Sequence, residues 1–393
     1  MNDASVQLKD WIIDQARMAL PEQRVDGSMP AGHNGPYSCP ERPLRNTCHW
    51  LITWCHVAKW TNEQVFMDAA QRALEYILLP MHRPSRANWW QRTLAGRDKC
   101  NGVIGAAWVI EALECAWGFL GSSEALREAS EVFALHRFDE DLGLWFRTEI
   151  DGSVLSIDRN FNHQLWFAAS GGRLAHAGDE LARKRVGAFL EHAGRLFSTY
   201  PDGLIKHRIG LHWWDRYLEP GRWAHELYVR LNVLRGRSTT ILKGHLRDTG
   251  YHAFNLHGFA LLHRVHCDHQ LWASDTFRGA LAFARSSEHE ARIERDNPYA
   301  YPYNPVGFEM AFALSRFVPS SLSEQSEWIA RQIRALGVDT SSRYGQCATD
   351  PNTARARIYE AVEWLREVPP DLNAMGTLNS HYFGRPSRDT STG

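Results

Sequence analysis

Two kinds of helical segment alternate along the chain, and they differ in the arrangement of their hydrophobic and polar positions. In the first kind, apolar residues recur every three or four positions, as in residues 62–79, 123–137 and 179–197. Such amphipathic segments bury one face and leave the other face in water. We therefore expect them to form the outer layer of a helical protein.

The second kind of segment is apolar on nearly every side and carries its polar residues in the first turn. Five such segments begin near Arg45, Asn101, Asn160, Tyr251 and Asn304. A helix that is hydrophobic all round is buried on all sides, so these segments are expected to lie inside. A sixth inner helix is predicted over residues 353–364, and the three asparagines are predicted to be N-caps.

The alternation predicts an all-α fold in which helical hairpins close into an (α/α)6 toroid. Closure places the uniformly apolar helices inside, so their polar first turns meet at one mouth of the ring. Short β-hairpin insertions are predicted at residues 144–148 and 154–157, joined by an Asp-Gly turn. We expect a single toroid domain over residues 1–384, followed by a disordered tail at 385–393.

Composition and charge exclude several classes of partner. The chain has 393 residues, and 44% of them are hydrophobic, which is enough for a large core. Lys+Arg (44) and Asp+Glu (45) nearly cancel, so no broad attraction to nucleic acid or to an anionic membrane is expected. The apolar runs are too short to span a bilayer. Any anionic ligand would need a local basic site, and the sequence makes no prediction of oligomeric state.

Cysteine usage and the first residues of the chain indicate a compartment. The seven cysteines are odd in number and include no Cys-x-x-Cys pair, which favours a reducing environment. No basic segment followed by an apolar run opens the chain, so no secretory signal is predicted and a cytoplasmic location is expected. Zinc-binding motifs and Gly-rich phosphate loops do not occur in the sequence. We therefore predict neither a metal nor a cofactor.

The chain is rich in tryptophan and histidine, with 16 Trp and 19 His. Indole faces stack on the C–H faces of sugar rings and imidazoles bond hydroxyl groups, so this composition fits a sugar-binding cleft. A helical core filled with aromatic side chains would have the same composition. Trp50, Trp108 and Trp166 recur at matching depth in three inner segments, and we expect at least one of them to stack on sugar.

The densest polar motif runs from Asp158 to Trp166, around one predicted helix start. Capping and an Asp–Arg pair would explain part of it, but so many distinct groups exceed what capping needs. A helix start also attracts an anionic substrate group. We therefore predict that Asp158 and His163 are catalytic, and that Arg159, Asn162 and Trp166 bind substrate.

Two other inner segments carry candidate chemistry. Tyr251, His252 and Asn255 share a helix face by their spacing, and a Tyr–His pair can exchange a proton with a sugar carbon. Glu309 is the charged residue of an otherwise apolar segment, and burial raises the pKa of such a carboxyl toward that of a general acid. The alternatives are a core histidine and a glutamate strut paired with an arginine. We predict catalytic roles for His252 and Glu309, and binding roles for Tyr251 and Asn255.

Polar residues before and at the start of the first two inner segments are predicted to bind substrate. They are His33, Tyr37, Arg45, His49 and Asn101. The first two belong to a loop rich in Gly and Pro that is expected to lie over the mouth, where glycine allows close approach of the backbone. Arg45 and Arg159 both lie at helix starts, which favours an acidic sugar.

The motifs at residues 33–37, 101–105, 161–169 and 251–256 carry a family resemblance. The chain resembles the six-hairpin glycosidase-like superfamily, which includes unsaturated glucuronyl hydrolases, N-acylglucosamine 2-epimerases and toroid domains of polysaccharide lyases. In more detail, it is similar to proteins of bacterial and archaeal surface-glycan gene clusters. The resemblance extends over residues 24–320.

The resemblance implies three different assignments of catalytic residues. In the hydrolases an Asp at the toroid mouth protonates the substrate, and Asp158 is its nearest match. In the epimerases histidines on inner helices move a proton beside a carbonyl, and His163 and His252 could match them. In the lyases Asn, His and Tyr neutralise a uronate and remove its C5 proton, and Asn162, His163 and Tyr251 could match those.

These observations predict a carbohydrate-active enzyme that cleaves an oligosaccharide or modifies a nucleotide-linked sugar, with a uronate as the favoured acidic sugar. The leading hypothesis is a glycoside hydrolase or lyase. The alternatives are a sugar epimerase or isomerase, and a non-catalytic glycan-binding scaffold. Asp158 is predicted to be the main catalytic carboxylate, with His163 and His252 as partners and Glu309 as second choice. To donate a proton near neutral pH, Asp158 would need apolar packing to raise its pKa against the effect of Arg159.

Overall fold

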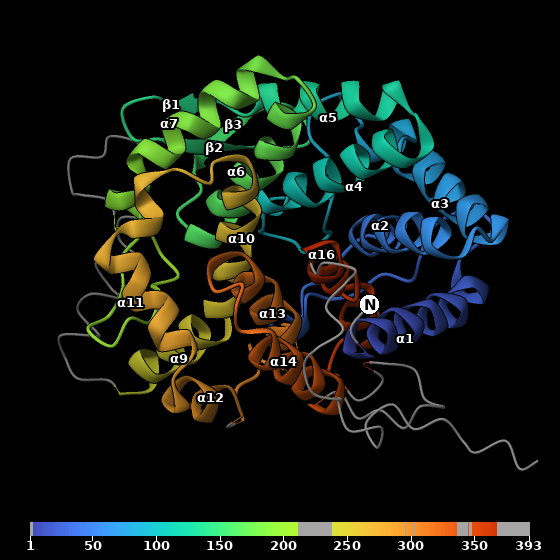
Figure 1. Cartoon of the computed structure of the whole chain (residues 1–393). Helices are drawn as coiled ribbons and strands as arrows, with labels where there is room; N and C mark the ends of the chain where they lie inside the picture. Colours follow the sequence, from blue (N-terminus) through green and yellow to red (C-terminus); the bar gives the residue numbers. More distant parts are fainter. Residues whose placement is uncertain are drawn as a thin grey trace, which may run out of the picture.

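The described part of the chain is built mainly from helices in two concentric layers (Figure 1). The computed structural model describes residues 3–210, 238–294, 296–301, 303–335, 345 and 348–367. Within these residues, six helices form an inner ring: α2 (Leu44–Thr61), α4 (Ile104–Leu120), α6 (Phe161–His176), α10 (His252–Val265), α13 (Val306–Phe317) and α16 (Tyr359–Glu367). Each contacts the next along the chain, and α16 also contacts α2, so the ring closes. The predicted (α/α)6 toroid is confirmed.

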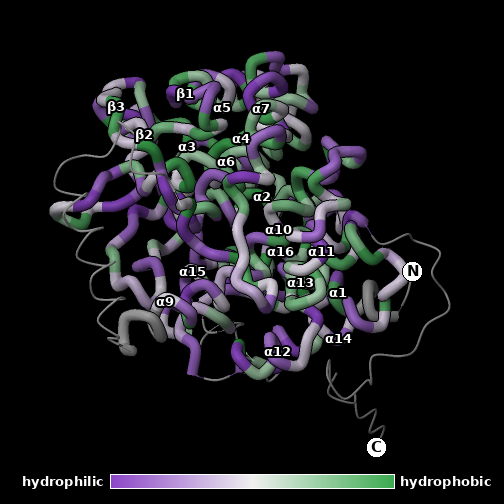
Figure 2. The backbone as a smooth tube through the Cα atoms, turned by 90° about the vertical axis from the view of Figure 1, so that its left-hand side faces the viewer, coloured by the Kyte–Doolittle hydropathy of each residue, from purple (hydrophilic) through white to green (hydrophobic). Residues whose placement is uncertain are grey.

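Amphipathic helices surround the ring. Four of them pack on the inner helix that precedes them: α3 (Gln64–Ile77), α5 (Ser123–Leu135), α7 (Glu180–Leu196) and α14 (Leu322–Ala335). The other outer helices are α1 (Asp3–Ala19), α9 (Ser238–Gly250), α11 (Asp275–Ala284) and α12 (Ser287–Glu294), and short 3-10 helices lie at Leu20–Glu22, Gly35–Tyr37, Pro80–His82 and Gln270–Ala273. Figure 2 shows hydrophobic residues concentrated on the inner helices. The three segments predicted to be amphipathic correspond to α3, α5 and α7, as expected for an outer layer.

The helix starts follow the predicted capping chemistry outside the ring but not inside it. Asp179 accepts a hydrogen bond from the backbone of α7 at 2.9 Å, as an N-cap does. On the inner helices, Asn101 lies two residues before the cap position of α4, and the Asn304 amide donates to two carbonyls outside α13. Asn160 occupies the N-cap position of α6, but its side chain makes no capping bond. The predicted N-cap position is therefore confirmed for Asn160 and wrong for Asn101 and Asn304, and the side chains of all three make other contacts near the mouth.

A small antiparallel sheet lies beside the mouth of the ring. Its strands are β1 (Phe138–Asp139), β2 (Leu144–Thr148) and β3 (Val154–Ile157), in the order β1-β2-β3. The bounds of β2 and β3 confirm the predicted hairpin, and Gly152 in its turn has a φ of 87°, which glycine adopts without strain. The sheet matters for function because β2 carries Arg147 and β3 ends directly before Asp158.

The last part of the ring is split and is joined to the first part by hydrogen bonds. The predicted helix over residues 353–364 consists of α15 (Pro351–Ala356) and α16, separated by Arg357 and Ile358. Asp350 caps α15 through Thr353 at 3.3 Å. Its other carboxylate oxygen accepts the backbone N–H groups of His33 at 2.8 Å and Gly35 at 3.1 Å. This seam joins two segments 317 residues apart in the sequence.

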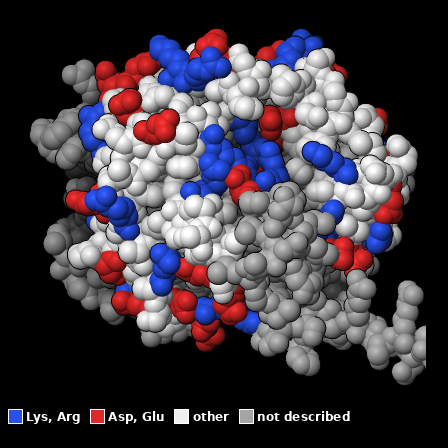
Figure 3. Space-filling model, viewed as in Figure 1, with Lys and Arg blue, Asp and Glu red and all other residues white. Residues whose placement is uncertain are grey.

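Ion pairs occupy the opposite end of the ring, where the inner helices finish. The Glu363 carboxylate bonds Arg173 at 2.6 Å and also Arg264, and Arg173 bonds Glu111 at 3.0 Å. This end faces the viewer in Figure 3, where basic and acidic side chains gather together near the centre. Positive and negative groups are paired here, in contrast to the other mouth.

The remaining predictions about the fold concern membrane spans, cysteines and the C-terminal tail. None of the described helices is long and apolar enough to cross a membrane. The six described cysteines are all free thiols: Cys39, Cys48, Cys55, Cys100, Cys115 and Cys267. The tail predicted at residues 385–393 lies outside the described residues.

Candidate functional site

A cavity of about 430 Å³ opens at the mouth where the inner helices begin. Its lining comes from the first turns of the ring, for example Arg45 of α2, Ile104 of α4 and His163 of α6. Tyr251 precedes α10, and Arg357 lies between α15 and α16. Segments far apart in the sequence therefore meet at one place, as predicted from their polar first turns.

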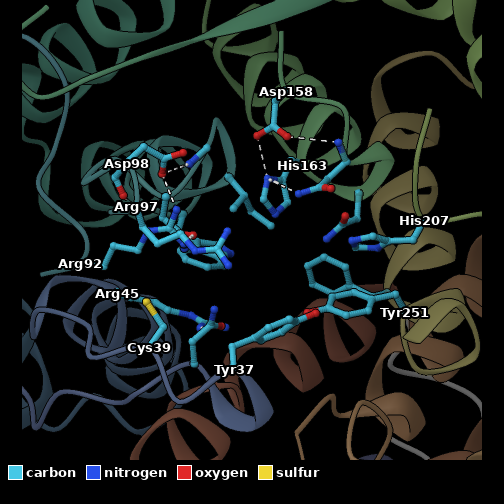
Figure 4. A pocket seen from close by; sticks show the side chains of 18 of the residues that line it. Tyr37, Cys39, Arg45, Arg92, Arg97, Asp98, Asp158, His163, His207 and Tyr251 are labelled. Carbon is cyan, nitrogen blue, oxygen red and sulfur yellow. Dashed lines mark hydrogen bonds and ion pairs between the residues drawn. The ribbon is translucent and has the colours of Figure 1, made fainter. Parts of the chain in front are cut away.

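Asp158 and His163 form a hydrogen-bonded pair in the cavity wall. Nδ1 of His163 lies 2.7 Å from Oδ2 of Asp158, which also accepts the backbone N–H of Val103 at 3.1 Å. Burial raises the pKa of Asp158, but His163, Arg147 and the N–H of Asn160 outweigh it and hold the pKa well below its usual value. Asp158 is therefore ionised and holds the proton on Nδ1. Figure 4 shows the His163 ring on the cavity side of Asp158, so Nε2 is the nitrogen available to a substrate.

His207 and Tyr251 lie along another side of the cavity, to the right of His163 in Figure 4. Their ring centroids are 4.9 Å apart. Burial, followed by the positive charges of Arg247 and His163, lowers the pKa of His207 well below its usual value, so its imidazole is neutral. Burial raises the pKa of Tyr251, so its hydroxyl keeps its proton. Both side chains are therefore uncharged, and the Tyr251 hydroxyl lies within hydrogen-bonding reach of Tyr37 and Tyr303.

Arginines outnumber carboxylates in the cavity lining. The arginines are Arg45, Arg92, Arg97, Arg147, Arg159, Arg208, Arg247 and Arg357, whereas the described carboxylates of the lining are Asp98 and Asp158. Asp98 lies 2.5 Å from Arg92 and 2.5 Å from Arg147. Burial raises its pKa, but these two arginines lower it below the usual value. The cavity therefore has a positive potential that favours an anionic ligand.

The floor of the cavity rests on buried ion pairs. Arg357 bonds Glu309 and Glu360 below it, each at 2.7 Å. Arg45 bonds Glu41 at 3.3 Å, and its guanidinium lies 4.0 Å from the ring centroid of Trp108. These contacts hold both guanidinium groups in place beneath a substrate.

Several buried polar atoms of the lining have no hydrogen-bond partner among the described residues. They are Nε of Arg45, Oδ1 of Asn162, Nδ1 of His207 and Nε of Arg247. Buried polar atoms are rarely left unpaired in proteins. Four of them around one cavity indicate that it binds a polar ligand or water.

The structure brings eight of the predicted site residues to the cavity. They are Tyr37, Arg45, Asn101, Asp158, Arg159, Asn162, His163 and Tyr251. They come from loops and helix starts between residues 37 and 251, so the predicted convergence of these segments is correct. Their chemical roles stay predictions.

Two residues predicted to be catalytic lie elsewhere. His252 is fully buried; its Nδ1 accepts the N–H of Ile205 at 3.2 Å and its Nε2 lies 3.0 Å from the carbonyl of Ala280. Both ring nitrogens are occupied, so His252 cannot exchange a proton with a ligand in the cavity. Glu309 is also fully buried and serves as the strut below Arg357. The prediction of catalytic roles is corrected for both residues.

Four residues predicted to bind substrate do not line the cavity: His33, His49, Trp166 and Asn255. His33 bonds the backbone of Thr349 at 3.0 Å, in the seam of the ring. His49 stacks on Tyr359 inside the ring, with centroids 4.4 Å apart. Asn255 donates to the backbone of its own helix at 2.9 Å. Their side chains stabilise the ring, and the predicted direct contacts with substrate are corrected.

At least one of Trp50, Trp108 and Trp166 was expected to stack on sugar; of these three, Trp108 lines the cavity, and Arg45 already lies over its ring. Trp166 stacks on Phe254 at 4.5 Å inside the core. Trp166→Ala is therefore expected to lower the free energy of unfolding by roughly 3–5 kcal/mol, because it removes a fully buried ring. Urea unfolding measures this change. The matched variant Trp117→Ala removes a half-buried ring and should cost less; an equal cost would contradict this assignment.

The sequence did not single out His207 or most of the arginines. Arg92 and Arg97 lie in the loop before α4, and His207 and Arg208 follow α7 without regular structure, so no helical period marked them. Arg147 had a readable signal: it stands in a strand whose five residues are all buried. Like Glu309, Arg147 is a charged residue within an apolar segment, so the same criterion marks it as a candidate site residue.

The chain is 38% identical over 358 residues to archaeal glycosylation protein Q of Haloferax volcanii. The alignment covers 90% of this chain and 96% of that protein. No family model matches the chain.

Solved structures of the same fold differ widely in sequence. Cellobiose 2-epimerase from Bacillus thermoamylovorans matches with a TM-score of 0.62 at 11% identity, over 92% of this chain and 99% of that one. An unsaturated glucuronyl hydrolase specific for heparin matches with a TM-score of 0.60 at 12% identity, over 93% and 96%. These matches confirm the six-hairpin toroid, whereas the choice of reaction depends on the site itself.

Proposed function

Because the chain belongs to the family of archaeal glycosylation protein Q, we propose that it is an enzyme that moves a proton beside the carbonyl group of an acidic sugar, as an epimerase or isomerase does. The observation that carries this proposal is the 2.7 Å contact between Asp158 and His163. The imidazole lies on the cavity side of an ionised, buried carboxylate, as a general base should. The arginines of the lining supply the preference for an acidic sugar.

His163 is the proposed base. Its Nδ1–H is held by Asp158, so the lone pair of Nε2 can accept a proton from the sugar carbon beside the carbonyl. The electron pair of the broken C–H bond forms an enolate, with negative charge on the former carbonyl oxygen. In an isomerase, His163 then gives the proton to the former carbonyl carbon, while the hydroxyl proton of the carbon that lost hydrogen moves to the former carbonyl oxygen and a new carbonyl group forms. In an epimerase, a water molecule on the other face of the sugar protonates the original carbon, and His163 releases its proton to solvent.

His207 and Tyr251 are the proposed donors to the oxygen that becomes negative. Both are uncharged, and they line the side of the cavity next to His163 (Figure 4). A neutral imidazole polarises a carbonyl without protonating it fully, and preorganised donors stabilise the enolate more than they stabilise the substrate. Arg357 also lines the cavity, but Glu309 and Glu360 balance its charge, so it is not counted among the groups that stabilise the enolate.

Hydrolysis has less support from the residues of this cavity. A glycosidase commonly needs one carboxyl group with a raised pKa to protonate the leaving group. The two described carboxylates of the lining, Asp98 and Asp158, both have lowered pKa values. The expectation that Asp158 donates a proton is therefore replaced by a role in positioning His163.

Solvent exchange tests the proposal. The protein is incubated in D2O with a panel of acidic sugars, free and nucleotide-linked, and the products are followed by NMR. We expect deuterium at the carbon beside the carbonyl of an intact sugar, because His163 exchanges its proton with solvent. His163→Gln should abolish the exchange. His176→Gln, at the exposed far end of the same helix, should not.

Other outcomes would contradict the proposal in distinguishable ways. New reducing ends without exchange would indicate a hydrolase. Absorbance of a conjugated double bond would indicate a lyase, whose reaction begins with the same removal of a proton from carbon. Binding of the sugars without any chemical change would indicate a glycan-binding scaffold.

A further inference from the structure

We propose that the acidic group of the substrate is a phosphate ester or a diphosphate, and that Arg92, Arg97 and Arg147 bind it. We call these three residues the arginine wall. The inference rests on the proposed function, because it names the substrate class of the same cavity. It distinguishes a substrate whose negative charge is a phosphate from one whose negative charge is the carboxylate of a free uronate.

The charge of the arginine wall matches two negative charges. Asp98 is bonded to Arg92 and Arg147 and offsets one of the three positive charges. Within the wall itself two positive charges remain, and the ionised Asp158, which is paired with His163, acts on Arg147 from outside the wall. A phosphate monoester carries about −1.5 to −2 at neutral pH, and a diphosphate diester carries one negative charge on each phosphate. A single uronate carboxylate would leave one positive charge unmatched in a half-enclosed cavity.

Two residues of the arginine wall, Arg92 and Arg147, are also preorganised to donate. Arg92 gives hydrogen bonds to the Asp98 carbonyl at 2.7 Å, the Asn101 amide at 2.9 Å and the Asp98 carboxylate at 2.5 Å. Arg147 bonds Asp98 at 2.5 Å, and Ser156 at 2.8 Å and 3.3 Å. A guanidinium has five N–H groups, so each of these arginines keeps about two for a ligand while its plane stays fixed.

The position of the arginine wall fits a group that links the sugar to a carrier. Arg92 and Arg97 lie on the side of the cavity opposite His207 and Tyr251 (Figure 4). Residues 93–97 are exposed, so this side is the rim of the mouth. A sugar beneath His163 can therefore place its phosphate on the arginine wall while a nucleoside or lipid carrier extends into solvent. Because that linkage occupies the anomeric carbon, the carbonyl beside which the proton moves is then a keto or carboxyl group elsewhere on the sugar.

Calorimetric titration tests the inference without a turnover assay. Inorganic pyrophosphate, UDP and glucuronate are titrated into the full-length protein. We expect pyrophosphate and UDP to bind at least about tenfold more tightly than glucuronate, and Arg97→Ala to weaken both by about tenfold or more. The control Arg127→Ala removes an exposed arginine of α5 outside the cavity and should change neither affinity.

The outcomes separate this inference from the proposed function. UDP tighter than pyrophosphate supports a nucleoside carrier, and equal binding supports the diphosphate group with another carrier. Pyrophosphate no tighter than glucuronate, or an Arg97→Ala protein that binds as well as the wild type, would overturn the inference. The His163→Gln variant should bind pyrophosphate with the affinity of the wild type. A loss of proton exchange in that variant would therefore leave the phosphate inference unaffected. Pyrophosphate binding with no exchange on any sugar would overturn the proposed function but not the arginine wall.

Discussion

His163→Gln is expected to lower kcat by roughly 10²–10⁴-fold, the usual contribution of a positioned general base. Glutamine keeps a polar side chain of similar reach but cannot accept a proton from carbon. The His163 side chain is 17% exposed, so the change leaves little cavity in the core, and the melting temperature should stay close to that of the wild type. Turnover is measured on the sugar identified by solvent exchange. Full activity in this variant would remove His163 from the mechanism.

Asp158→Asn tests how His163 is positioned. The Asn amide can donate to Nδ1, which favours the tautomer with its proton on Nε2, and that tautomer cannot act as a base. We expect a loss of kcat of roughly 10²–10⁴-fold. The dependence of kcat/KM on pH should also change shape, because the ionised partner of the imidazole is gone. If Asp158 had only a structural role, the Asp158→Asn change would lower the free energy of unfolding and leave that pH profile unchanged.

Arg357→Met is expected to lower the free energy of unfolding by about 3–5 kcal/mol, because it leaves two buried carboxylates without their partner. Glu309 and Glu360 are both fully buried and bond Arg357 at 2.7 Å. The exposed pair Arg183 and Glu180 gives the control, since Arg183→Met should cost no more than about 1 kcal/mol. Urea unfolding measures both variants.

The pH dependence of the Arg357→Met defect has a definite sign. Burial raises the pKa of Glu309 and Glu360, whereas Arg357 lowers it, so removal of Arg357 raises both values further. A carboxyl whose pKa is higher in the folded state holds its proton there, and its stabilising effect is lost as pH rises through that pKa. The defect should therefore be larger near about pH 8 than near about pH 5. A defect that grows toward acid would contradict the assignment.

The ring itself could be predicted from the sequence because burial on all sides leaves a pattern along each helix. The alternation of α2 with α3 and of α6 with α7 is visible as apolar against amphipathic segments. The β2–β3 hairpin was marked by its turn. These features depend on residues close together in the chain, so their physical causes can be read locally.

The site could be predicted only in part, because side-chain direction depends on packing between distant segments. Tyr251 and His252 are neighbours, yet one lines the cavity and the other bonds Ala280 on the outer side of the ring. Glu309 looked like an acid in isolation, and its partner Arg357 follows 48 residues later. His207 lies in irregular chain, where no periodicity indicates which side chains turn inward.

The seam at Asp350 has a consequence for how the protein is made. The carboxylate that bonds His33 belongs to a residue translated 317 positions later. At roughly 5–20 residues per second, about 16–60 s separate the synthesis of these two residues. During that interval the apolar face of α2 that later meets α15 and α16 has no neighbour, and the floor arginine at 357 does not yet exist. The ring and the floor of the cavity are therefore complete only after the last inner helix has been synthesised and has packed against α2.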